Sequence, residues 1–323
     1  MRARALPAGR LLMIAAAAAL IAVLPFRLSG YHQGLAAAVA IYFIAILGLN
    51  ILTGFSGQIS IGHGAFMAIG GYTTAIMSHD HHTNLIATLP LALAIAFGCG
   101  LLVGLPALRL SGVYLALATF ALAVSVPQFA LKFSKFSGGS NGIQTAETKS
   151  HLWLYGVSWA CAAIGFVLAW LLLRGRIGRA FRAVRDSEVA AASSGIALPI
   201  YKTFAFGVSA AYAGVAGSLF VLATNGFAQP NEFGVLLSLK ILIGAAVAGL
   251  GSLWGVPAGA LFIGLLPTIS ADVPLVGSTH GQDVVFGLAV ILIMLLLPTG
   301  VVGLLRNLDR SFKIAIKSDP KAS

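Results

Sequence analysis

Long apolar runs, separated by short polar loops, recur along the whole chain and restrict its fold more than any other feature. Several approach the roughly 18–20 residues that a helix needs to cross a bilayer. The ten runs are Leu11–Phe26, Leu35–Leu52, Ala65–Met77, Leu85–Leu108, Val113–Leu131, Trp153–Leu173, Thr203–Leu222, Val235–Leu250, Trp254–Ile269 and Val284–Leu305. Only 9% of the 323 residues are charged, against about 25% in a soluble domain. The sequence therefore predicts an all-α integral membrane protein with about ten transmembrane helices.

The basic residues predict how the chain is oriented in the membrane. Five arginines lie between Arg174 and Arg185, and five basic residues follow Leu305. Such clusters beside membrane spans mark cytoplasmic loops, so we expect both termini in the cytoplasm and, despite the net charge of +11, no nucleic-acid partner. The expected organisation is a basic segment with a retained first helix over residues 1–30, a polytopic membrane domain over 31–305 and a basic tail over 306–323.

The stretch GFSGQISIGHG, residues 54–64, interrupts the apolar pattern with glycines and polar side chains. Non-helical backbone at membrane depth is tolerated only where it is buried in protein or lines a water-filled cavity. Polar groups at that depth mark transport paths or binding partners. Asn50, Gln58, Ser60 and His63 are therefore our candidates for the wall of a translocation pathway. The alternative is a packing seam between helices, where small residues and serines are equally common.

A second glycine-rich stretch, GLGSLWGVPAG at residues 249–259, lacks the glutamine and histidine, so a packing role is favoured there. Each stretch follows a similar hexapeptide, LNILTG at 49–54 and LKILIG at 239–244. This similarity suggests a two-fold internal repeat, as in many transporters. Because several apolar runs are short and interrupted by glycine, we also expect broken or re-entrant helices.

The loop at residues 174–200 combines five arginines with a short alanine-rich segment. Glu188 to Ser194 is predicted to form a helix, capped by Asp186 or Ser187 at its start and ended by Gly195. A helix with such a smooth face is suited to a groove of another protein. The alternative is a basic loop that touches anionic lipid.

Several of these segments together resemble LivM-type permease subunits of branched-chain amino acid ABC importers. The motifs, in chain order, are GLNILTGFSGQISIGHGAFMAIGGY, SGVYLALATFAL, FSGGSNGI, GRAFRAVRDSEVAAASSGI with YKTFAFGVSAAYAGVAGSLF, GLGSLWGVPAGA and LLPTGVVGLL. The resemblance covers residues 34–305 and implies an ABC importer permease fold. One departure is SVPQFALKFSKF at residues 125–136, where an acidic residue or asparagine is expected, and it leaves the substrate open.

The resemblance also implies partners and roles. It implies a bacterial inner-membrane heterodimer with a sister LivH-type permease, two cytoplasmic ATPase subunits and a periplasmic solute-binding protein. ATP and Mg²⁺ would belong to the ATPases, since this sequence has no G-x-x-x-x-G-K-[ST] loop, and this chain would be non-catalytic. The residues expected to couple to the ATPase are Arg179, Arg182, Arg185, Asp186, Glu188 and Gly195.

Four other functions are weighed against this expectation. The same kind of permease can carry urea, short amides or other small amino or organic acids. An ion-coupled secondary transporter needs intramembrane ionisable pairs, yet no Asp or Glu lies within the core of any run. A passive channel or a non-transport scaffold would need no ATPase partner.

Overall fold

The computed structural model describes residue 25 and residues 27–81, 83–145 and 150–271, with the short pieces 287–288, 291–292, 295 and 300–303. The element order is α2 (Gly30–Leu49), η2 (Asn50–Phe55), α3 (His63–His81), α4 (Leu85–Ala107), α5 (Gly112–Lys132), α6 (Ser134–Ser137), η3 (Gly139–Asn141), β1 (Ile143–Gln144), α7 (His151–Arg174), α8 (Arg176–Asp186), α9 (Glu188–Ser193), α10 (Leu198–Ala223), β2 (Phe227–Ala228), η4 (Pro230–Phe233), α11 (Val235–Ala248) and α12 (Val256–Ala271). The first predicted span is described only at Pro25, the last is described only in the short pieces between 287 and 303, and the tail at 306–323 lies outside the described residues.

Six of the described helical segments are long and apolar enough to cross a membrane. They are Gly30–Phe55, Leu85–Ala107, Gly112–Lys132, His151–Arg174, Leu198–Ala223 and Pro230–Ala248. The helices α3 and α12 correspond to two further predicted runs. The helical membrane architecture predicted from the apolar runs is confirmed for this part of the chain.

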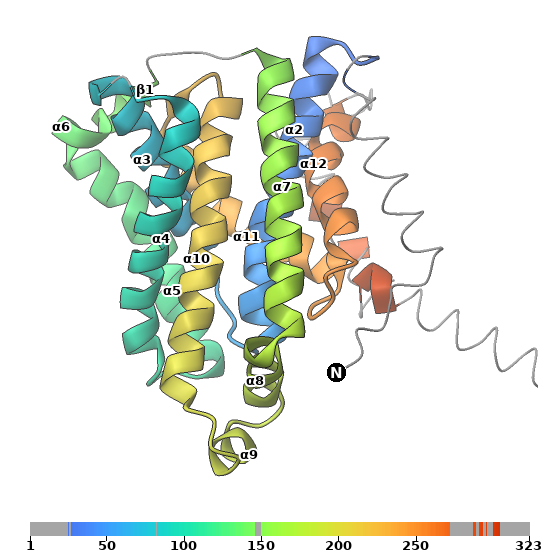
Figure 1. The fold of residues 1–323 in the computed structure, drawn as a ribbon. Helices are drawn as coiled ribbons and strands as arrows, with labels where there is room; N and C mark the ends of the chain where they lie inside the picture. The colour runs from blue at the N-terminus through green and yellow to red at the C-terminus, as the bar shows by residue number, and fades with distance from the viewer. Residues whose placement is uncertain are drawn as a thin grey trace, which may run out of the picture.

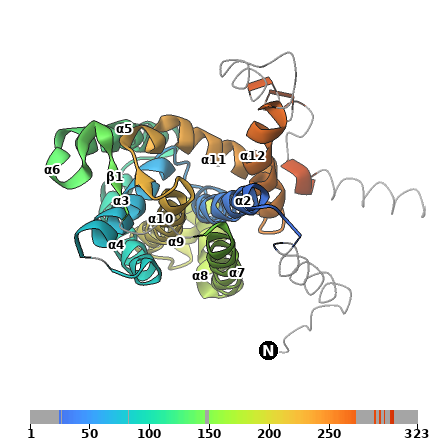
Figure 2. The same ribbon diagram turned by 90° about the horizontal axis from the view of Figure 1, so that it is seen from above.

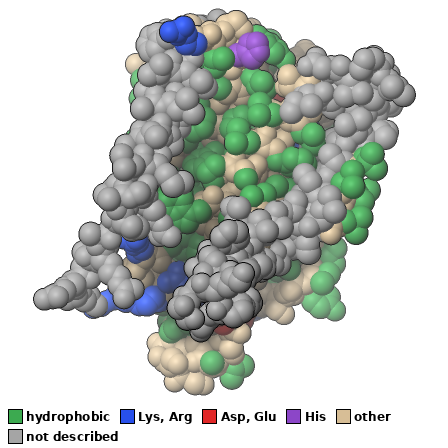
Figure 3. Space-filling model, turned by 90° about the vertical axis from the view of Figure 1, so that its right-hand side faces the viewer, with side chains coloured by type: hydrophobic (Ala, Val, Ile, Leu, Met, Phe, Trp, Pro, Cys, Tyr) green, Lys and Arg blue, Asp and Glu red, His purple; other side chains and the backbone are tan. Residues whose placement is uncertain are grey.

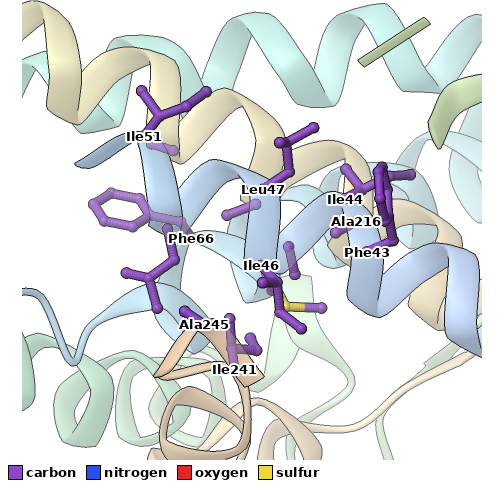
Figure 4. Packing of buried hydrophobic residues seen from close by; sticks show 14 of the residues in the cluster. Phe43, Ile44, Ile46, Leu47, Ile51, Phe66, Ala216, Ile241 and Ala245 are labelled. Carbon is purple, nitrogen blue, oxygen red and sulfur yellow. The ribbon is translucent and has the colours of Figure 1, made fainter. Parts of the chain in front are cut away.

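Helix α2 lies at the centre of the bundle (Figures 1 and 2). Its apolar residues do not form one stripe but surround the helix, which is expected when neighbours cover every face. It packs against α7, α10, α11 and α12. In the span Gly30–Phe55, 78% of the most apolar 18-residue stretch is buried. Figure 4 shows side chains of this core, including Leu47 of α2, Phe66 of α3 and Ile241 of α11.

Helix α10 is the second buried helix, and it packs against α3 and α4 through glycines. A Cβ atom at Gly70 would collide with the backbone of Gly214, and one at Gly217 would collide with the backbone of Met67. Such small residues let two membrane helices approach closely and gain dispersion contacts that lipid cannot supply. This glycine packing holds α10 against α3 and α4, and α8 and α9, which precede α10 in the chain, contact it in turn.

The outer helices α4, α5 and α7 carry apolar side chains on their exposed faces. Only 28%, 22% and 28% of their most apolar windows are buried. Figure 3 shows hydrophobic side chains over the middle of one face of the molecule, with Lys and Arg gathered toward its ends. An apolar belt with basic ends is the surface that a bilayer requires.

The connecting elements gather at the two ends of the bundle (Figure 1). At one end, β1 pairs antiparallel with β2, with Ile143 opposite Ala228, beside α6. The motif FSGGSNGI, residues 136–143, lies there and has positive φ angles at Gly138, Gly139 and Gly142. At the opposite end, α8 and α9 project beyond the long helices. The two ends of the bundle therefore differ: one has the short β1–β2 pair and the other has the short helices α8 and α9.

Candidate functional site

The glycine-rich stretch forms a break between two helices. Helix α2 continues into the six-residue π-helix η2 (Asn50–Phe55), residues 56–62 are not helical, and α3 begins at His63. Gly57 adopts φ +76°, a conformation that glycine takes without steric cost. A π-helical turn of this kind is frequent at functional sites.

Asn50 joins the two glycine-rich stretches of the sequence. Its side chain is completely buried, its Nδ2 donates to the Ser252 carbonyl at 2.8 Å, and its Oδ1 accepts from the Gly251 amide at 2.8 Å. A Cβ atom at Gly54 would collide with both Asn50 Oδ1 and the Gly251 backbone. The side-chain amide of Asn50 thus pairs with backbone groups of the second glycine-rich stretch and joins that stretch to η2.

Gln58 and Ser60 are also buried and bonded within the protein. The Nε2 of Gln58 donates to Ser56 Oγ at 2.7 Å and to the Lys202 carbonyl of α10 at 3.3 Å. The Oγ of Ser60 accepts from the Gly62 amide at 3.3 Å. These side chains hold the break in shape, while Gly57 and Ile59 are its exposed residues.

His63 begins α3 and lies against α2. It is 1% exposed, and neither ring nitrogen has a hydrogen-bond partner within the described part of the chain. A Cβ atom at Gly48 would lie 3.4 Å from His63 Nε2 and 3.0 Å from the Ser209 carbonyl. The Oγ of Ser209 is likewise buried without a partner among the described residues. His63 is thus the most poorly satisfied polar side chain of the break.

The structure includes the short helix that was predicted from Glu188 to Ser194. Helix α9 begins at Glu188, and the Oγ of its N-cap Ser187 accepts from the Ala190 amide at 3.3 Å. It ends at Ser193, one residue earlier than predicted, and Gly195 follows with φ +79°. Ala191 is buried, whereas Val189 is 78% exposed. The face of α9 that includes Val189 is therefore turned away from the bundle, and Ala191 lies on the face turned toward it.

Helix α8 (Arg176–Asp186) attaches these residues to the bundle. Phe181 is completely buried and its ring lies 6.5 Å from those of Tyr201 and Phe204 of α10. The strong amphipathic pattern of α8 explains this packing, since its apolar positions recur along one face.

Five of the six residues expected to couple to an ATPase are exposed, and Arg182 is partly buried. Several of them are also bonded within the chain. The Nη1 of Arg182 donates to the Leu173 carbonyl at 3.2 Å, and the Nη1 of Arg185 donates to the Gly54 carbonyl at 3.0 Å. The Nε and Nη2 of Arg185 also bond Asp186 Oδ1, at 3.0 and 2.9 Å.

Lys202 is the residue of this region that sequence reasoning missed. It lies in the first turns of α10, is 6% exposed, and places its Nζ 2.6 Å from Glu188 Oε1. The signal in the sequence was a single lysine beside an apolar run, which resembles an ordinary span end. Only the fold shows that it lies between α9 and the break.

Comparison with known proteins places the chain in a family. Residues 31–297 match the family described as branched-chain amino acid transport system / permease component. The chain belongs to this family. The predicted resemblance is thereby confirmed, and it extends over most of the described structure.

The relatives of this chain include two kinds of permease protein. The chain is 33% identical over 270 residues to the high-affinity branched-chain amino acid transport system permease protein LivM of Salmonella typhimurium and of Escherichia coli. The match covers 74% of this chain and 63% of each LivM protein. The chain thus spans less than two thirds of the LivM proteins. It is 25% identical over 286 residues to LivH of Escherichia coli, covering 81% of this chain and 91% of that one. No solved structure matches the chain.

Proposed function

We propose that this chain is the transmembrane permease subunit of an ATP-driven ABC importer for the branched-chain amino acids leucine, isoleucine and valine. The observation that carries the proposal is the family match over residues 31–297, together with 33% identity to LivM. Transport would proceed by alternating access, in which the helices expose the pathway first to one side of the membrane and then to the other.

The proposal includes partner chains. They are a sister LivH-type permease, two cytoplasmic ATPase subunits that bind ATP and Mg²⁺, and a periplasmic solute-binding protein. Similarity to both LivM and LivH supports pairing of two related permeases. The missing phosphate-binding loop in the sequence supports a non-catalytic role for this chain.

The break between η2 and α3 is our proposed pathway wall. Asn50, Gln58, Ser60 and His63 lie on or directly beside it. Gln58 and Ser60 form hydrogen bonds within the break, Asn50 joins the preceding turn to the second glycine-rich stretch, and Gly57 and Ile59 are exposed. Non-helical backbone in a membrane protein needs a polar or protein-buried environment, which supports a solute path along the exposed side of the break.

Helices α8 and α9 are our proposed ATPase contact. The exposed groups there are Arg179, Asp186, Gly195 and the outer face of α9, while Arg182, Arg185 and Glu188 secure the two helices to the rest of the chain. Support comes from the position of α9, which projects from the end of the bundle (Figure 1). An ATPase that moves α9 would therefore act on a segment attached to the break.

The proposed placement is the bacterial inner membrane, with ten spans and both termini in the cytoplasm. The domain limits remain residues 1–30, 31–305 and 306–323. The contact of Asn50 with Gly251 and Ser252 supports a two-fold repeat, because it brings the two similar glycine-rich stretches together. An even number of spans agrees with basic residues at both ends of the sequence.

Uptake of labelled solutes tests this function. Cells that lack the gene, with neighbouring genes intact, should lose uptake of leucine, isoleucine and valine, and a plasmid copy should restore it. Labelled urea is the matched solute for the alternative importer. Loss of urea uptake alone would reassign the substrate, and uptake that persists without any ATPase would favour an ion-coupled transporter.

A further inference from the structure

Lys202 connects the cytoplasmic helix α9 to the glycine-rich break. We propose that Lys202 is a positioning residue that transmits movement of α9 to residues 54–62. This inference rests on the proposed function in one respect, since the movement would be driven by an ATPase bound to α9. The connection itself is a property of this chain alone.

The side chain of Lys202 forms the first half of the connection. Its ammonium group is 2.6 Å from Glu188 Oε1 in the first turn of α9. The lysine side chain is 7% exposed and the glutamate side chain 48% exposed. A buried ammonium without a partner is strongly disfavoured, so Lys202 and Glu188 are expected to move together. Their link is stronger than that of an exposed surface pair, which contributes little.

The backbone of Lys202 forms the second half. Its carbonyl oxygen accepts a bond from Gln58 Nε2 at 3.3 Å. Gln58 is bound to the rest of the break, because its Nε2 also donates to Ser56 Oγ and its own carbonyl accepts from Thr53 Oγ1 at 3.0 Å. One residue of α10 is therefore bonded to α9 through its side chain and to the break through its backbone.

Arg185 provides a parallel connection from the end of α8. Its guanidinium donates to the Gly54 carbonyl at 3.0 Å, and a Cβ atom at Gly57 would lie 2.8 Å from its Cγ. Arg185 thus contacts the beginning of the break, while Lys202 reaches Gln58 further along. Ser187, which has an extended backbone, separates α8 from α9. Rotation of α9 about Ser187 would pull on Lys202 while Arg185 holds Gly54.

Breaking the Glu188–Lys202 ion pair and breaking the hydrogen bond from Gln58 to the Lys202 carbonyl should have different effects. Loss of the Glu188–Lys202 ion pair frees α9 but leaves the break bonded to α10 through the Lys202 carbonyl. Loss of the Gln58 side chain removes the bond between the break and the Lys202 carbonyl but leaves α9 attached to α10. The series Glu188, Lys202 and Gln58 therefore joins α9 to the break, beside the separate bond from Arg185 of α8 to Gly54.

Hydrogen exchange on the full-length protein in lipid nanodiscs tests whether the connection holds α9. Glu188→Gln and Lys202→Met should each raise amide exchange of residues 188–195 by about tenfold, with residues 54–62 much less affected. The exchanged pair, Glu188→Lys with Lys202→Glu, should recover most of the protection. Lys135→Met, at an exposed lysine at the other end of the molecule, is the matched control. Unchanged exchange in α9 would overturn the inference.

Reconstituted transport tests whether the connection transmits movement. In vesicles that hold this chain with its co-purified partner subunits, Lys202→Met should leave ATP hydrolysis largely intact and lower leucine uptake by about tenfold, and the exchanged pair should recover it. A parallel fall of both activities, or no change in either, would overturn the inference. If the wild-type complex moves no leucine, the proposed function fails instead, and the exchange experiment still decides whether Lys202 positions α9.

Discussion

At the scale of single residues, the break depends on side chains that replace missing backbone partners. Asn50 can do this because a carboxamide carries both a donor and an acceptor, and the two groups it meets are the Ser252 carbonyl and the Gly251 amide. Neither leucine nor aspartate supplies both functions. This pairing explains why an asparagine stands near the end of Gly30–Phe55, the most buried of the described membrane spans.

Replacing Asn50 should therefore destabilise the protein more than its size suggests. Asn50→Leu buries a leucine at the Asn50 site and leaves two partly buried backbone groups unpaired, where a fully buried unpaired group costs about 1–3 kcal/mol. We expect a clear fall in the midpoint of thermal unfolding of detergent-purified protein. Asn141→Leu, at an exposed asparagine of η3, should leave that midpoint nearly unchanged. Equal midpoints for the two variants would contradict the bridging role.

Gly54 is the second residue that close contacts restrict to one residue type, here glycine. Gly54→Ala places a methyl group against Asn50 Oδ1 and the Gly251 backbone, and overpacking of this kind costs about 1–3 kcal/mol. Gly98→Ala in α4 is the matched control, since nothing lies within 4 Å of the added atom and alanine favours the helix. Thermal unfolding should separate the two variants. A neutral Gly54→Ala would show that the two glycine-rich stretches do not meet.

At the scale of elements, α9 is too short to be stable by itself. Helices shorter than about 12–15 residues are marginal in water, and α9 has six residues. Its stability must come from the Ser187 cap, from burial of Ala191 and from the Glu188–Lys202 pair. Such a helix can be shifted by a partner at modest cost, which suits a segment that transmits movement.

Removing the cap measures this dependence. Ser187→Ala should cost about 1 kcal/mol of helix stability and so raise amide exchange at the beginning of α9 by several-fold. Ser193→Ala is the control, because its hydroxyl bonds back to the Val189 carbonyl, an arrangement that does not stabilise a helix. Faster exchange in both variants, or in neither, would contradict a specific capping role for Ser187.

The elements also show how far sequence reasoning reaches. The apolar runs predicted the described long helices, and Ser187 and Gly195 predicted the limits of α9 within a residue, because these signals are local. The π-helical turn of η2 was not predicted, since it is stabilised by Asn50 bonds to residues about 200 positions away. The Lys202–Glu188 ion pair was not predicted either, because the two residues lie in different helices. The packing of α8 on α10 brings them together.

At the scale of the whole molecule, apolar side chains fill the interior and also cover the outer faces of the bundle. The buried helices α2 and α10 pack through small residues, while α4, α5 and α7 present apolar faces outward. Because lipid satisfies those outer faces, the few buried polar contacts carry an unusual share of the specificity. One group of these contacts joins the break to α8 and α10, and another joins α3, α4 and α10 through Thr74, Thr88 and Ser218. The first group includes the proposed moving parts.

Orientation in the membrane is the prediction on which this arrangement depends. In a variant whose Cys99 and Cys161 are replaced by alanine, single cysteines at Ser140 and Ala192 report the two ends, since both positions are exposed. A membrane-impermeant maleimide should label Ser140→Cys in intact spheroplasts and Ala192→Cys only after the membrane is opened. The reason is the row of arginines in α8, which the positive-inside rule keeps in the cytoplasm.

The two labels also distinguish how the arrangement can fail. Only α7 separates the two positions among the helices long enough to span, so labelling of both from one side would mean that α7 does not cross the membrane. Labelling with the sides reversed would keep the bundle but expose α9 to the periplasm, where no ATPase could reach it. In that case the contacts of Lys202 would remain, yet they would have no source of movement to transmit.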